Sequence, residues 1–259
     1  MAEVQTKVIL VGLGGATCSG KTTLAKHLKN ILPNSVIVHQ DDFAPPEELL
    51  PIKHGYQDWD APDYAIDYPR LSNFLKHVKD TGSIPDDHRS HDHLNKQTDL
   101  PIEAECQHRL AERFRVIQDQ AKESDHINIV WGLVDGFLLY WNQEVIEQLD
   151  MRFLLRVPLK TLEGRRKARQ VYITAKGDAW VDPSDYWEKI VLPAYLDAHG
   201  EIFESGDVES GGLTNKVKGL VLIEPEKDKG MSMTDVVERC CQELYQFVRA
   251  EGLSKGVDV

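Results

Sequence analysis

The sequence contains no apolar run close to the roughly 20 residues that a membrane-spanning helix needs. Its first residues, MAEVQTK, lack the apolar stretch of a secretion signal. Together, these two absences predict a cytoplasmic protein that has no membrane partner.

Cysteine is scarce, and basic residues are outnumbered by acidic ones. The four cysteines show no C-x-x-C spacing, and Cys240 and Cys241 fall in an apolar helical stripe, which is typical of core residues in a reducing compartment. The formal net charge of −12 argues against a nucleic-acid partner or an anionic membrane surface. An acidic protein is compatible with a cationic small substrate.

What the sequence does contain is a glycine-rich loop that matches G-x-x-x-x-G-K-[ST]. It follows the apolar run 8–13, and Leu24, Leu28, Ile31 and Leu32 recur after it at helical spacing. Strand, loop and helix in this order favour a phosphate-binding loop, in which backbone N–H groups and a helix N-terminus surround phosphate oxygens. The alternative is a glycine-rich turn that carries a lysine by chance. We expect ATP to bind the loop residues Gly15, Ala16, Thr17, Cys18, Ser19, Gly20, Lys21, Thr22 and Thr23.

Five apolar runs read as buried strands. Continuous rather than alternating apolar runs indicate a parallel sheet that is covered on both faces, and amphipathic segments lie between them. We therefore expect an α/β fold: a doubly wound, mostly parallel five-stranded sheet with helices on both faces, in one domain over 1–259, with the nucleotide at the carboxyl ends of the strands. The runs are 8–13, 35–39, 127–134, 151–157 and 219–223.

Two segments depart from this pattern. Residues 44–66 are rich in proline and aromatic side chains, which suggests a flap that faces the substrate. Residues 80–102 form a polar loop insertion with a His/Asp cluster at 86–93. That cluster could bind metal, but its spacing matches no closed zinc site, so we expect a solvated loop and assign it no function.

Acidic residues follow two of the predicted strands. Asp41 and Asp42 follow the run 35–39. At the end of that strand a carboxylate can accept a proton from an attacking hydroxyl and contact Mg²⁺. The alternative is that one of them only caps the turn. Of the two, Asp41 is the expected base. Asp135 follows the run 127–134, and an acid at this position of an apolar strand can position Mg²⁺. The alternative is an ordinary Asp-Gly turn that ends the strand. The expected metal ligands are Thr22, Asp41 and Asp135.

A basic cluster and an aromatic-acid pair complete the candidate residues. Arg165, Arg166 and Arg169 lie in an expected lid at 159–182 and could neutralise the transferred phosphoryl group, unless they form a solvated helix face. Trp59 could stack on a flat cationic ring, and Asp60 could accept hydrogen bonds from a ribose diol. The alternative for Trp59 is a loop aromatic that packs on the core.

With these pieces in order, the chain resembles the uridine kinase-like branch of P-loop kinases, and within it nicotinamide riboside kinases of the fungal type. The matching stretches span most of the length. They are GATCSGKTTLAKHL, HQDDFAPP, YQDWDAPD, VDGFLLY, RRKARQVY and DPSDYWEKIVLPAY.

The resemblance implies transfer of the ATP γ-phosphate to the 5′-hydroxyl of nicotinamide riboside, with ATP and Mg²⁺ bound by a monomer or weak homodimer. It implies that Trp59 and Tyr172 sandwich the nicotinamide ring, that Asp60 and Arg166 bind the ribose diol, and that Arg165 and Arg169 face the phosphates. The lid alignment is open by one residue around Gln170. The implied substrate-binding set is Asp41, Asp42, Phe43, Trp59, Asp60, Arg166 and Tyr172.

Two other functions stay open at this stage. A uridine or cytidine kinase of the same fold would recognise the pyrimidine edge with groups such as His54, Tyr56 or Gln57. A P-loop nucleotide switch would need an N-K-x-D stretch for guanine, and the nearest match, 215–218, reads Asn-Lys-Val-Lys and lacks the acid.

Overall fold

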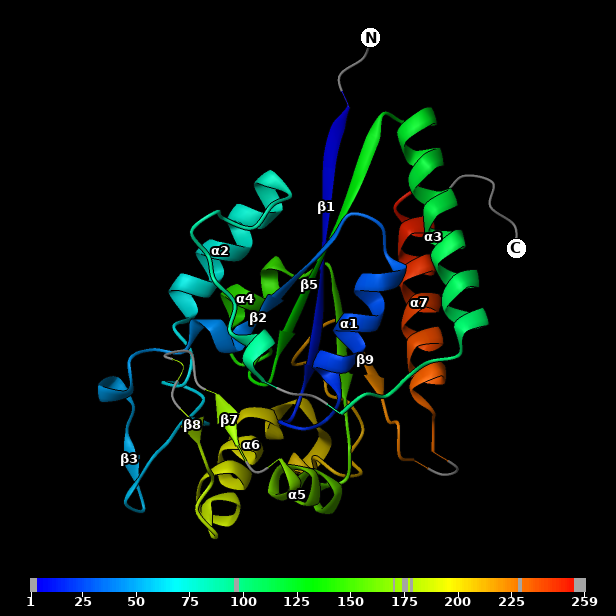
Figure 1. Ribbon diagram of the computed structural model, residues 1–259. Helices are drawn as coiled ribbons and strands as arrows, with labels where there is room; N and C mark the ends of the chain where they lie inside the picture. Colours follow the sequence, from blue (N-terminus) through cyan, green and yellow to red (C-terminus); the bar gives the residue numbers. More distant parts are fainter. Residues whose placement is uncertain are drawn as a thin grey trace.

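The computed structural model describes residues 4–95, 98–169, 171–173, 177, 179–227 and 230–253. Its centre is a five-stranded sheet in which every neighbouring pair is parallel, in the order β2-β5-β1-β6-β9 (Figure 1). All five apolar runs of the sequence form these strands, so the predicted sheet is confirmed. The strands are β1 (Gln5–Gly15), β2 (Ser35–His39), β5 (Ile127–Gly136), β6 (Met151–Leu155) and β9 (Leu220–Ile223).

Helices cover both faces of the sheet (Figure 1). One face carries α1 (Lys21–Ile31), α3 (Ala104–Ser124) and α7 (Met233–Ala250), whose buried side chains form one cluster with Ile9 and Val11 of β1. Val8 and Leu10 point to the opposite cluster, because successive side chains of a strand alternate between faces. β1 is thus apolar along its whole length because it is buried twice, which confirms the doubly wound fold.

The second face is covered by other helical segments. They are α2 (Tyr68–Thr81), α4 (Gln143–Gln148), a π-helical turn (Trp187–Val191) and α6 (Leu192–His199). Local sequence sets the ends of α2: the Asp67 side chain accepts a hydrogen bond from the Arg70 backbone N–H, and Gly82 takes the left-handed conformation after the last turn. Short 3₁₀ turns span Gln40–Phe43, Glu47–Leu49, Asp92–Leu94, Gly200–Ile202 and Glu204–Gly206.

Strand register brings three predicted site segments to one edge of the sheet. Asp135 lies opposite Leu13 of β1 on one side and opposite His39 of β2 on the other. The loop after β1, the turn after β2 and the carboxyl end of β5 therefore meet at this edge. Near it lie α5 (Leu159–Ala168) and two hairpins, β3 (Ile52–Lys53) with β4 (Tyr56–Gln57) and β7 (Tyr172–Ile173) with β8 (Ala179–Trp180) (Figure 1).

The two hairpins fall inside the expected flap and lid. The turn between β3 and β4 uses His54 and Gly55, both with positive φ (52° and 84°), as a two-residue hairpin turn requires. Neither hairpin was predicted as such, because strands of two residues leave no periodicity in the sequence.

A close approach fixes the end of β1. The Tyr140 hydroxyl donates to the backbone carbonyls of Phe153 (2.7 Å) and Gly12 (3.1 Å), and its ring lies close to Gly14. A Cβ atom at Gly14 would come within 2.3 Å of that ring. Glycine is therefore required at position 14 for the tyrosine to reach the carbonyls of the two neighbouring strands.

Within the described ranges, no helix combines the length and the apolar character that crossing a membrane requires.

Candidate active site

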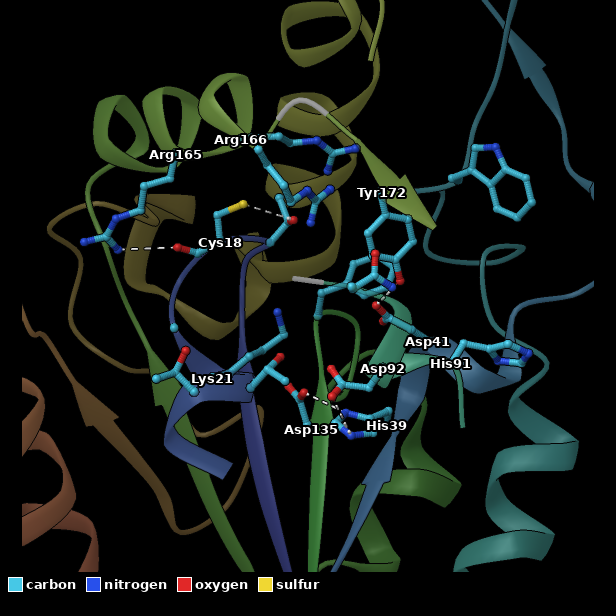
Figure 2. A pocket seen from close by; sticks show the side chains of 18 of the residues that line it. Cys18, Lys21, His39, Asp41, His91, Asp92, Asp135, Arg165, Arg166 and Tyr172 are labelled. Atoms are coloured by element: carbon cyan, nitrogen blue, oxygen red, sulfur yellow. Dashed lines mark hydrogen bonds and ion pairs between the residues drawn. The ribbon is translucent and has the colours of Figure 1, made fainter. Parts of the chain in front are cut away.

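A cavity of about 780 Å³ opens at the carboxyl edge of the sheet (Figure 2). Its walls come from the loop after β1, the turn after β2, the end of β5, the flap, the insertion and the lid. Most of the residues proposed from the sequence line it. These are Thr17, Cys18, Gly20, Lys21, Thr22, Thr23, Asp41, Asp42, Trp59, Asp60, Asp135, Arg165, Arg166, Arg169 and Tyr172.

The loop 15–22 has the backbone of an anion cradle. Gly15, Cys18 and Gly20 have positive φ (147°, 61° and 96°), which turns the chain sharply before α1 begins at Lys21. A Cβ at Gly15 would meet the Leu155 carbonyl oxygen at 2.7 Å, so this position also requires glycine. Ala16 and Ser19 are buried behind the cavity wall.

The Lys21 ammonium group is held within the loop. Its Nζ donates to the Ala16 carbonyl oxygen (3.2 Å), and the side chain is largely buried. A positive charge and the N-terminus of an eleven-residue helix thus face the same space, which suits the phosphates of a nucleotide.

Asp135 lies beside the loop with one carboxylate oxygen occupied and one free. Oδ2 lies 3.1 Å from His39 Nδ1, whereas the buried Oδ1 has no hydrogen-bond partner (Figure 2). Burial favours the neutral acid, but the His39 hydrogen bond and the Lys21 charge outweigh it and hold the pKa of Asp135 below its ordinary value. For His39, burial acts to lower the pKa, yet the bond to Asp135 and the charges of Asp135 and Asp92 raise it overall. Each partner thus favours the charged form of the other.

A buried, ionised oxygen without a partner fits a divalent cation. Mg²⁺ prefers oxygen ligands and keeps several waters, so it needs only one or two protein groups besides substrate phosphates. Thr22 and Asp135 both line the cavity and offer a hydroxyl and this carboxylate oxygen. No group of three or more His, Cys, Asp or Glu side chains is arranged for a metal ion among the residues that the structure describes.

Asp41 sits in the turn Gln40–Phe43 with its carboxylate against the cavity. The Tyr172 hydroxyl from β7 donates to its Oδ2 (2.8 Å; Figure 2). Loss of solvation by the surrounding protein atoms raises the pKa of Asp41, and the nearby Asp135 charge raises it further. The Lys21 charge and the Tyr172 hydrogen bond lower this pKa, but they do not outweigh the two other effects. A carboxylate with a raised pKa is a stronger proton acceptor than an ordinary aspartate.

The side chains of the next two residues of this turn are buried. The Asp42 carboxylate is 2% exposed and accepts from the His91 backbone N–H (2.9 Å), with His88 Nε2 3.4 Å away. Phe43 is 2% exposed and packs on Phe74 and His88. The structure does not bring Phe43 to the cavity, contrary to its place in the implied substrate-binding set.

The segment 80–102 was expected to be a solvated loop, and the structure shows that side chains in its middle are partly covered by contacts with the site. The two histidines just described hold Asp42, and Asp92 pairs with Lys26 of α1 (2.7 Å). Asp92, Asn95 and Leu100 also line the cavity. These contacts join residues far apart in the chain, so no local pattern could have revealed them.

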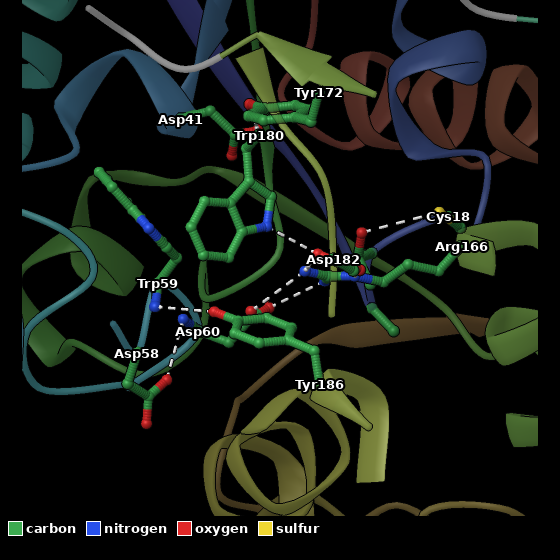
Figure 3. A network of polar contacts seen from close by, with 12 residues as sticks. Cys18, Asp41, Asp58, Trp59, Asp60, Arg166, Tyr172, Trp180, Asp182 and Tyr186 are labelled. Atoms are coloured by element: carbon green, nitrogen blue, oxygen red, sulfur yellow. Dashed lines mark hydrogen bonds and ion pairs between the residues drawn. The ribbon is translucent and has the colours of Figure 1, made fainter. Parts of the chain in front are cut away.

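Arg166 is buried between two carboxylates (Figure 3). Its Nη1 donates to Asp60 Oδ1 (3.1 Å) and its Nε donates to Asp182 Oδ2 (2.6 Å). Trp180 Nε1 also donates to Asp182 (2.8 Å). Burial acts against the charged form of Asp182, yet the Arg166 hydrogen bond outweighs it and lowers its pKa. Arg166 and Asp60 were each expected at the ribose diol, but their ion pair was not predicted. Trp180 and Asp182 were missed, although the sequence Trp-Val-Asp again places an aromatic residue close to an acid.

Three aromatic rings line the cavity where the flap and the lid meet. They are Trp59 from the flap and Tyr172 and Trp180 from the lid, and the rings of Trp59 and Trp180 lie edge to face at 6.5 Å (Figure 3). The Arg169 guanidinium lies over the Tyr172 ring, 4.7 Å from its centre. Arg165 reaches the opposite side, where it donates to the Cys18 carbonyl (3.4 Å) and pairs with Glu226 (2.6 Å). Gln170, around which the lid alignment was open, lies outside the described residues.

No protein-family profile matches the chain. Among curated proteins, the nicotinamide riboside kinase of Schizosaccharomyces pombe is 35% identical over 210 residues, which cover 81% of this chain and 86% of that protein. The nicotinamide riboside kinase of Saccharomyces cerevisiae is 30% identical over 94% of this chain and 98% of its own length. The nicotinamide riboside kinase of Eremothecium gossypii is 34% identical over 78% of this chain and 80% of its own length.

Proposed function

Because the chain belongs to the nicotinamide riboside kinase family, we propose that it transfers the γ-phosphoryl group of ATP to the 5′-hydroxyl of nicotinamide riboside. The products are nicotinamide mononucleotide and ADP. The family resemblance seen in the sequence and the similarity to fungal relatives over 78–94% of the chain support the same reaction.

One observation carries the assignment of roles within the cavity. The Asp41 carboxylate faces the same space as Lys21 of the phosphate loop and the Arg166–Asp60 pair of the nucleoside side. A base between a phosphate site and a diol site is the arrangement that a sugar kinase requires, because the attacking hydroxyl must meet the γ-phosphorus in line with the leaving oxygen.

The chemical step forms one bond and breaks one. The 5′-oxygen of the riboside attacks the γ-phosphorus, the bond from that phosphorus to the β–γ bridging oxygen breaks, and ADP leaves with the electron pair. Asp41 accepts the hydroxyl proton. Lys21 and the backbone N–H groups of the loop stabilise the charge that spreads over the phosphoryl oxygens.

Thr22 and Asp135 would hold Mg²⁺, with Asp135 offering the oxygen that has no partner. When bound, the ion neutralises phosphate charge. His39 keeps the Asp135 carboxylate ionised and fixes its orientation through Oδ2. Arg165 and Arg169 line the cavity from the lid and add positive charge around the transferred group.

The nucleoside side supports a cationic ring. Trp59, Tyr172 and Trp180 line the cavity with aromatic rings on which a pyridinium can stack. Asp60 is buried and held by Arg166, so its carboxylate is fixed in place to accept hydrogen bonds from the ribose diol.

The test is a comparison of kcat/KM for nicotinamide riboside and uridine with ATP as donor, because the ratio reports differential binding of the two transition states. We expect nicotinamide riboside to be preferred by at least about 10²-fold, roughly what the loss of one to two charged or stacking contacts produces. Equal or reversed preference would instead identify a uridine or cytidine kinase. ATP turnover without any nucleoside would exclude both.

A further inference from the structure

The insertion touches three separate parts of the site through residues 88–95, which we call the clasp. Its contacts reach Asp42 after β2, Lys26 of α1 and Ile173 of β7. We propose that the clasp holds the lid strand β7 over Asp41, with Asn95 as the positioning residue. This proposal rests on the function proposed above, because it assigns the clasp a role in forming the nucleoside site.

The contact between Asn95 and the lid is bidentate. Asn95 Nδ2 donates to the Ile173 carbonyl (3.0 Å), and Asn95 Oδ1 accepts from the Ile173 N–H (2.8 Å). A side-chain amide carries a donor and an acceptor in one plane, so it can satisfy both polar groups of a strand residue as a neighbouring strand would. Asn95 thus completes the edge of β7 that faces away from β8.

The lid hairpin needs such support. Among the residues that the structure describes, Tyr172 pairs with Trp180 and Ile173 with Ala179, and an isolated two-stranded hairpin is at best marginally stable in water. Tyr172 precedes Ile173 directly and donates to Asp41 Oδ2 (2.8 Å). Fixing the backbone of Ile173 therefore fixes where the Tyr172 ring stands in the cavity.

The clasp is itself anchored to the phosphate side. The His91 backbone N–H donates to Asp42 Oδ1 (2.9 Å), and the Asp92 carboxylate pairs with Lys26 (2.7 Å), five residues beyond Lys21 on the same helix. Figure 2 draws Asp92 and His91 on opposite sides of Asp41, with Tyr172 of the lid above. The clasp therefore links α1, the turn that carries the base and the lid through contacts with Lys26, Asp42 and Ile173.

Two measurements on the full chain test this role. The first is hydrogen exchange of the Ile173 amide, and the second is the KM for nicotinamide riboside with the kcat. In Asn95→Ala we expect faster exchange of the Ile173 amide and a KM about tenfold higher, with kcat within about twofold, because bound nucleoside itself draws the lid into place. Asn95→Asp keeps the acceptor and loses the donor, so its exchange rate and KM are expected between those of Asn95→Ala and the unaltered chain.

The matched control is Asn73→Ala, which removes an exposed asparagine from α2. It should change neither measurement. A raised KM with unchanged Ile173 exchange would overturn the proposal, because Asn95 would then act by touching the nucleoside. Faster exchange with unchanged KM would also overturn it, since the lid position would not matter for binding. If the unaltered chain phosphorylates no nicotinamide riboside, the proposed function fails, while the exchange measurement still decides whether Asn95 holds β7.

Discussion

Replacing Arg166 should unfold the nucleoside side of the site and destabilise the whole chain. The Arg166 side chain is 7% exposed, and its partners Asp60 and Asp182 are 9% and 24% exposed. In Arg166→Met the apolar stem is kept, but two carboxylates that repel one another lose the charge between them. Removing one member of a buried ion pair costs about 3–5 kcal/mol. We take the lower end, about 3 kcal/mol, because Asp182 regains water.

Urea unfolding measures this loss directly. With a slope near the upper end of the usual ~1–3 kcal/mol/M, a loss of about 3 kcal/mol lowers the midpoint by about 1 M. The double variant Asp60→Asn with Arg166→Met removes the more deeply buried of the two charges and should recover part of the loss, which a double-mutant cycle quantifies. Lys167→Ala, at the exposed neighbouring position, should leave the midpoint unchanged.

The same variant should lose activity for a related reason. Without Arg166 the Asp60 carboxylate is no longer fixed. Losing its two charge-assisted hydrogen bonds to a ribose diol, at about 1.5 kcal/mol each, should lower kcat/KM by about 10²-fold. A midpoint within about 0.3 M of the unaltered chain would refute the buried network. A normal kcat/KM would remove Asp60 and Arg166 from the diol site.

Three further substitutions test the base and the stacking site. Asp41→Ala should lower kcat by at least about 10²-fold with the urea midpoint unchanged or higher, because the raised pKa of Asp41 means that its ionised form does not stabilise the fold; near-normal kcat would show that Asp41 is not the base. Tyr172→Phe removes a hydrogen bond that lowers the pKa of Asp41, so that pKa should rise further. Activity needs the ionised base and is lost as pH falls through its pKa, so the acid limb of log kcat/KM should move to higher pH; a limb that stays or moves lower would contradict the contact. Trp59→Ala should raise the nucleoside KM about tenfold with little change in kcat, because stacking acts equally in the ground and transition states; steady-state kinetics with an unchanged KM would exclude Trp59 from the pocket.

The sequence predicted the sheet and the phosphate loop because both depend on local patterns. A strand buried on both faces must be apolar at every position, as β1 is, and a loop around phosphates needs glycine at fixed spacing. The role of His39 was missed, although a polar residue at the carboxyl end of a parallel strand is a usable signal. His39 meets Asp135 only because β2 and β5 are neighbours.

The contacts of the clasp were beyond the reach of sequence reasoning for a different reason. Asn95 contacts a residue 78 positions later, and His91 one 49 positions earlier. Such polar contacts are specified by the folded geometry, whereas the clasp itself reads as an ordinary hydrophilic loop. Phe43 shows the converse: the QDDF motif led to the expectation of a substrate contact, but its phenylalanine packs in the core.

The close approach of the Tyr140 ring to Gly14 has an evolutionary consequence. Any side chain at position 14 would overlap the aromatic ring, and a smaller residue at position 140 would strip the hydroxyl from the Gly12 and Phe153 carbonyls. A substitution at position 14 or 140 alone should therefore destabilise the fold, so we expect homologues to change both positions together or neither. Position 140 thereby restricts the mutational paths open to the strand that leads into the nucleotide loop, although its side chain does not line the cavity.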